Sequence, residues 1–66
     1  MEDYVKRMVD ELTELEERKT KLERFINEDE RFKALPMPEQ NLMRLQLNGM
    51  AVYRYALGKR LELKTL

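Results

Sequence analysis

The sequence predicts an all-α fold, and three observations support this. Hydrophobic residues make up 42% of the chain and charged residues 39%, a balance typical of helices that bury one face and expose a charged one. The 66 residues include only two glycines and two prolines, so long uninterrupted helices fit. Apolar residues also recur at spacings of three and four. We expect one domain, residues 1–66, built as an antiparallel two-helix hairpin.

The first helix is expected over residues 3–28, from a heptad-like stripe on one face. The apolar residues of the stripe are Val5, Met8, Leu12, Leu15, Leu22 and Ile26. Lys19 interrupts it, and either fixes the register of the pairing or faces a ligand cavity. On the outside, Glu14 and Arg18 stand four residues apart, in the orientation that favours an ion pair.

An elbow is expected over residues 29–37, because the helical pattern breaks in "NEDERFKALPMP". Asn27 suits a left-handed helix terminus, and the residue before Pro36 should be extended. Phe32 should fold back over the end of the helix pair from one short helical turn. Pro38 fits the first position of the second helix, with Gln40 as its capping-box partner.

The second helix is expected over residues 38–64, and it carries apolar residues on two opposite sides. At about 100° per residue, one side collects Leu42, Met43, Leu47, Met50, Tyr53, Leu57 and Leu61. The other side collects Leu45, Gly49, Val52, Ala56 and Leu63. The first helix can cover only one of them. We therefore predict that the second side is the interface of a homo-oligomeric helical bundle, in which Gly49 lets another backbone approach closely. The alternative is that Gly49 tolerates a kink.

The composition argues against several classes of function. The chain contains no cysteine and no histidine, which excludes disulfides, thiolate or histidine metal ligands, and histidine-based catalysis. We expect no enzyme activity, no metal and no cofactor. The apolar runs are too short for a membrane span, and a cytoplasmic location is expected. The formal net charge of zero argues against a duplex nucleic acid partner.

Tyrosines and cations near the two ends of the chain form the candidate ligand site. In an antiparallel hairpin the start of the first helix lies beside the end of the second. The candidates are Tyr4, Arg7, Lys19, Arg54, Tyr55 and Arg60, with the tyrosines stacking on a base and the cations binding phosphate. The alternative is that they are ordinary amphipathic side chains at an interface.

A family resemblance adds a functional expectation. Phe25-Ile26, the segment Leu35 to Gln40, and then Gln46-Leu47, Met50, Tyr53 and Arg60 stand in this order along the chain. The pattern resembles small phage and prophage proteins of the crAssphage-related type, over nearly the whole chain. The architecture is also similar to that of the anti-CBASS cyclic-nucleotide sponges, whose small helical subunits capture immune signals between subunits without cleaving them.

This resemblance implies a phage counter-defence protein in the cytoplasm of an infected bacterial host. Its partners would be further copies of itself and a cyclic di- or oligonucleotide. The alternative function is a non-catalytic adaptor that binds a host or phage protein through the second apolar side of the second helix. A structural virion component also stays open.

Overall fold

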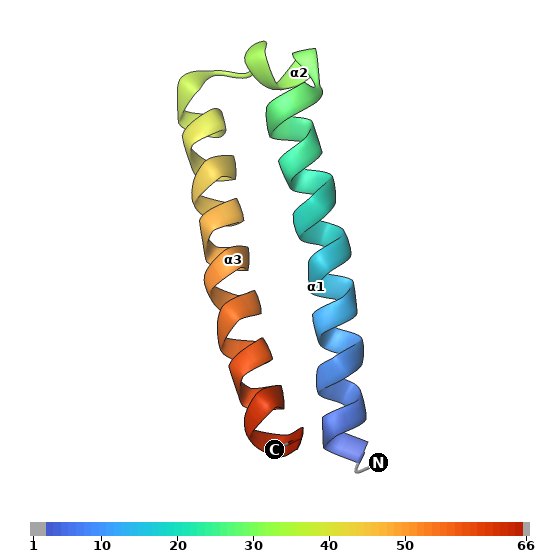
Figure 1. The fold of residues 1–66 in the computed structure, drawn as a ribbon. Coiled ribbons are helices and arrows are strands. Elements are labelled where there is room, and N and C mark those ends of the chain that lie inside the picture. The colour runs from blue at the N-terminus through green and yellow to red at the C-terminus, as the bar shows by residue number, and fades with distance from the viewer. Residues whose placement is uncertain (1–2, 66) are drawn as a thin grey trace.

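A computed structural model of the chain describes residues 3–65. It contains α1 (Asp3–Glu28), α2 (Glu30–Lys33) and α3 (Met37–Thr65). Figure 1 shows α1 and α3 side by side and antiparallel, with α2 at the closed end and the start of α1 beside the end of α3 at the open end. These residues contain no strand, which confirms the all-α prediction. The hairpin is 46 Å long and 15 Å across, and α3 begins one residue before the predicted 38–64 range and ends one residue after it.

The stripe on α1 faces α3, as its spacing predicts. Met8 and Leu15 are buried, each only 5% exposed. The remaining stripe positions are half-buried: Val5, Leu12, Lys19, Leu22 and Ile26. On the outer surface, the Arg18 guanidinium lies 3.5 Å from the Glu14 carboxylate. The alternating spacing therefore selects the packed side of α1, with a lysine inside the stripe.

α1 ends at an aspartate cap. Asp29 is extended (φ −95°, ψ 122°), and its side chain accepts a hydrogen bond from the Arg31 N–H as the N-cap of α2. The predicted left-handed conformation of Asn27 is wrong, because no residue from 3 to 65 has a positive φ. The cap satisfies a free N–H of α2, so the chain can turn without a left-handed residue.

Two side chains fill the closed end of the hairpin. Phe32, on α2, is 2% exposed and meets the Phe25 ring edge to face at 6.0 Å, which confirms that it folds back. The Gln40 carboxamide is buried and donates to the Leu35 carbonyl at 2.9 Å and to the Lys33 carbonyl at 3.4 Å. The predicted capping box is absent. The residue before α3 is Pro36, which has no N–H for Gln40 to accept.

The side of α3 that faces α1 is narrower than predicted. Leu57 is 1% exposed. Met43, Leu47, Met50 and Leu61 are half-buried along the same side. Leu42 and Tyr53 are exposed instead, because each is rotated by about 80–100° from Met43 around the helix.

The opposite side of α3 is uncovered within the hairpin. We call it the outer face, and it consists of Leu45, Gly49, Val52, Ala56 and Leu63, all exposed. Leu45, Val52 and Leu63 are 64%, 69% and 73% exposed. A Cβ built on Gly49 meets no atom within 4 Å, although glycine inside a helix costs about 1 kcal/mol relative to alanine. Nothing within the hairpin requires this glycine.

Candidate ligand-binding site

The six predicted ligand residues are spread along both long helices. Tyr4, Arg7 and Lys19 lie on α1, and Arg54, Tyr55 and Arg60 lie on α3. At about 1.5 Å of rise per residue, Tyr4 and Lys19 are roughly 22 Å apart along α1. A single hairpin therefore does not gather all six around one small ligand.

At the open end an aromatic ring contacts one cation, and two further cations lie one helical turn away. The Lys64 ammonium lies 5.3 Å from the centre of the Tyr4 ring, in a cation–π contact that joins the two ends of the hairpin. Arg7 follows Tyr4 by one turn and Arg60 precedes Lys64 by one turn, and both are exposed. We call these four residues the open-end cluster. Lys64 is outside the predicted set, although the sequence places a base within one turn of Arg60.

Tyr55 lies on the opposite flank of the hairpin. The Lys59 ammonium is 5.5 Å from the centre of its ring and 3.3 Å from a Glu62 carboxylate oxygen. Nine residues separate Tyr55 from Lys64, which rotates them by about 180° around α3. Because Tyr4 contacts Lys64, the two predicted stacking tyrosines face away from each other in one chain.

The other two predicted cations already have acidic partners. Arg54 Nε donates to the Glu16 carboxylate on α1, and both side chains are partly exposed. Lys19 Nζ donates to Glu23 Oε1 at 3.2 Å. A phosphate that approached either cation would compete with a carboxylate. By contrast, Arg7, Arg60 and Lys64 of the open-end cluster form no ion pair within residues 3–65.

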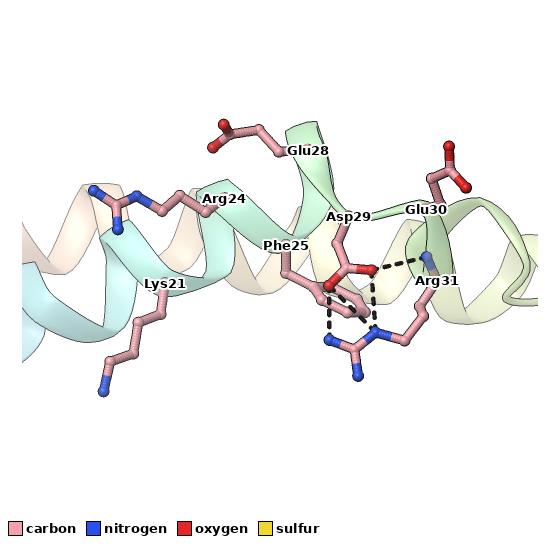
Figure 2. Close-up of a pocket in the computed structure, with 7 residues that line it drawn as sticks. All are labelled: Lys21, Arg24, Phe25, Glu28, Asp29, Glu30 and Arg31. Carbon is pink, nitrogen blue, oxygen red and sulfur yellow. Dashed lines mark hydrogen bonds and ion pairs between the residues drawn. The ribbon is translucent and has the colours of Figure 1, made fainter.

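A groove runs beside the elbow, and the charge pattern alone does not reveal it. It is lined by Lys21, Arg24, Phe25, Glu28, Asp29, Glu30 and Arg31 (Figure 2). The three bases and three acids among them give the groove no net charge. Figure 2 shows Lys21 and Arg24 extending away from the Asp29–Arg31 pair rather than towards a common point.

Asp29 and Arg31 hold the elbow together. The Arg31 guanidinium donates to Asp29 Oδ2 at 2.7 Å from Nη2 and to Oδ1 at 3.1 Å from Nε. The same guanidinium lies 5.7 Å from the centre of the Phe25 ring. The side-chain hydrogen bond from Arg31 lowers the pKa of Asp29 to about 2, and the pKa of Arg31 is raised in turn. The groove therefore has a structural role, because its ion pair and cation–π contact hold the elbow in place.

Within residues 3–65, no group of three or more acidic side chains is placed to hold a metal ion. Over the same residues, none of the helices combines the length and the apolar character that a bilayer crossing requires.

Comparisons with known proteins place the chain in a family. A search of curated proteins gives no significant match, and a search of solved structures gives none either. The family model Sequestin matches residues 2–63, nearly the whole length of the chain. The family name points to sequestration of a ligand or partner, which fits a small helical protein with exposed aromatic and cationic groups. On this match, the 66-residue hairpin belongs to the Sequestin family.

Proposed function

We propose that this protein is a phage counter-defence protein that sequesters a cyclic nucleotide immune signal between subunits, without cleaving it. The open-end cluster carries the proposal, because it joins an aromatic ring to cations at an exposed edge. Membership of the Sequestin family supports sequestration in general. The lack of histidine and cysteine in the sequence favours binding over catalysis.

Each group in the open-end cluster has a distinct role in the proposal. The Tyr4 ring stacks on a nucleobase, and the Arg60 and Arg7 guanidinium groups bind phosphate through paired N–H donors. Lys64 orients the Tyr4 ring and adds positive charge. One hairpin presents these groups at an exposed end, so enclosing a ligand takes a further copy. The site would lie in the cytoplasm of the infected host, where the signal is made.

Isothermal titration against cyclic dinucleotides, cyclic trinucleotides and cyclic ADP-ribose isomers tests the proposal. We expect micromolar or tighter binding to one class, weakening as salt rises because phosphate charge is involved. Tyr4→Leu and Arg60→Gln should each weaken binding at least tenfold. The control Arg18→Gln removes an exposed cation that already pairs with Glu14. Absence of heat with every ligand at micromolar protein would refute the proposal.

A second candidate function is a non-catalytic adaptor. The exposure of Leu45, Val52 and Leu63 favours it, because a host or phage protein could dock on this apolar face. Light scattering separates the two candidates. A stable oligomer consumes the outer face and supports sequestration, whereas a monomer leaves that face free for another protein and supports the adaptor.

A further inference from the structure

Gly49 and Gly58 both lie inside α3, where glycine destabilises a helix relative to alanine. A Cβ on Gly58 would meet Arg54 Nη1 at 3.3 Å, so this position is partly filled by its own chain. A Cβ on Gly49 would meet open space. The reason for a glycine at position 49 must therefore lie outside the single hairpin.

The side of the hairpin that carries the outer face is large enough for a protein interface. The hairpin presents a side of 46 by 15 Å, about 700 Å² in projection, close to the ~800 Å² that each partner contributes to a standard interface. The hairpin itself buries few hydrophobic side chains: Met8, Leu15, Phe32 and Leu57. A core this small favours stabilisation by association.

The distribution of charge on α3 selects a second copy in the antiparallel direction. Lys59, Arg60 and Lys64 lie in its last turns, together with Glu62. Residues 37–51 of α3 carry one cation, Arg44, and the neutral amides Gln46 and Asn48 lie beside the first half of the outer face. Parallel pairing would place the cations of one copy against those of the other. Antiparallel pairing places them against the amides and also opposes the helix dipoles.

We infer that α3 pairs antiparallel with α3 of a second copy, with Gly49 opposite the partner's Ala56. These two residues are the smallest on the outer face, so their opposition allows the closest approach of the backbones. In this register the twofold axis that relates the two copies passes close to Val52. The same flanks of the two helices then adjoin, and the partner's Asn48 lies between Tyr55 and Lys59, within about one turn of each.

This juxtaposition makes a shared site on the Tyr55 flank. Tyr55 supplies an aromatic face and Lys59 a cation, already in contact at 5.5 Å. The partner's Asn48 supplies a carboxamide, which can both donate to and accept from the edge of a nucleobase. The shared site lies on the flank of α3 opposite Lys64, so it is a second site, separate from the open-end cluster. Its ligand assignment rests on the proposed function: a second cyclic nucleotide, held by both copies. The pairing itself does not.

Cysteine cross-linking tests the pairing without any ligand, because the chain has no native cysteine. We expect a mixture of Gly49→Cys and Ala56→Cys chains to form mixed disulfide dimers in dilute solution, since opposed positions come within bonding range. Val52→Cys should cross-link to itself. Gly49→Cys alone should not, because seven residues of offset separate the two copies of this position, roughly 10 Å along the axis. Thr20→Cys, on α1, controls for random collision.

The cross-linking outcomes decide the register. Mixed dimers together with Val52→Cys dimers support antiparallel pairing. If Gly49→Cys and Ala56→Cys each form self-dimers, and mixed dimers are no more frequent than these, the pairing is parallel and the inference is overturned. Failure of Val52→Cys to cross-link above the Thr20→Cys control also overturns it. Light scattering on the unmodified protein provides an independent check, since a monomer at micromolar concentration contradicts any pairing.

Titration of the variant Asn48→Ala tests the shared site. We expect the unmodified protein to show a second class of binding site for the best cyclic nucleotide, and Asn48→Ala to weaken that class at least tenfold. The affinity of the open-end cluster, the mass and Val52→Cys cross-linking should stay unchanged. Asn27→Ala, which removes an exposed amide on α1, should bind normally. Unchanged affinity of the second class in Asn48→Ala overturns the shared site while leaving the proposed function intact. If no nucleotide binds the unmodified protein, the proposed function fails and the ligand part of the inference falls with it, whereas the cross-linking result still decides the pairing.

Discussion

Arg54 on α3 is ion-paired with Glu16 on α1, and within residues 3–65 no other ion pair joins the two long helices. The side chains are 47% and 43% exposed, so water screens the charges. An ion pair of this kind contributes little to folding stability, typically below about 1 kcal/mol. The ion pair nonetheless engages Arg54, one of the cations that the sequence predicts to bind phosphate.

Glu16→Gln should therefore separate stability from binding. We expect the free energy of unfolding to fall by no more than about 1 kcal/mol, measured by urea denaturation. Affinity for a cyclic nucleotide should stay unchanged in Glu16→Gln and in Arg54→Gln, because the open-end cluster does not include Arg54. A change of affinity in either variant would show that Arg54 belongs to the ligand site.

Gln40→Ala should destabilise the closed end of the hairpin. The variant leaves the Leu35 and Lys33 carbonyls without their side-chain donor. A buried acceptor that loses its partner costs about 1–3 kcal/mol. Gln46→Ala, an exposed position on the same helix, should change the free energy of unfolding by less than about 0.5 kcal/mol. Equal effects of the two variants would contradict the role assigned to Gln40.

Leu57→Ala should be among the most destabilising single truncations. Leu57 is 1% exposed, so the change removes buried methyl groups and leaves a cavity between α1 and α3. Such changes cost about 2–5 kcal/mol. Met37→Ala, where the side chain is 59% exposed, is the control and should cost about 0.5 kcal/mol or less. Thermal unfolding at fixed protein concentration gives both values.

Asp29 should make the elbow sensitive to acid. Its pKa is about 2 in the folded chain, below the ordinary value of 3.8, because the carboxylate accepts hydrogen bonds from Arg31. The stability that the Asp29 carboxylate contributes to the elbow is complete above its pKa in the unfolded chain. It is lost as the pH falls from about 4 to about 2. The measurement is the protection factor of the Arg31 amide against hydrogen exchange, relative to an unfolded peptide at the same pH. Asp29→Asn should remove the pH dependence of this protection factor, whereas Glu30→Gln should retain it. Loss of the pH dependence in both variants would contradict the assignment.

Gly49→Ala and Gly58→Ala should differ in their effect on self-association. Both substitutions add helix propensity, up to about 1 kcal/mol in the isolated helix. At position 49 the new methyl group enters the space that the second backbone occupies, so the dissociation constant should rise. At position 58 the new methyl group meets the flexible tip of Arg54 in its own chain, and association should be unchanged. Sedimentation equilibrium over a range of dilutions measures both. Tighter association of Gly49→Ala would contradict close packing at this residue.

The all-α hairpin could be predicted because its signals are local. The stripe from Val5 to Ile26 fixes the buried side of α1, and Pro36 ends the chain's helical path before α3. The details of the elbow depend on contacts between individual side chains, and a periodic pattern does not show which of these contacts form. Asn27 stays helical because Asp29 caps α2, and Gln40 points inwards because two carbonyls lie within its reach.

The candidate site was less accessible to sequence reasoning. The proximity of the two chain ends follows from the topology, and Tyr4 does meet a cation there. The partner of Arg54 could not be predicted, because it depends on which acid of α1 lies opposite after the helices pack. Tyr53 shows the same limit. A rotation of about 80° around the helix decides whether a side chain is covered by α1 or exposed. The Tyr53 side chain is 47% exposed.

The rod shape of the hairpin affects how its mass must be measured. Its radius of gyration is 14.9 Å, whereas a compact domain of this length would have about 11 Å. Frictional drag on an elongated particle is higher than on a sphere of equal mass, so gel filtration would overstate the number of chains. Small-angle X-ray scattering avoids this error, because lateral pairing widens the cross-section of the rod while leaving its length nearly constant.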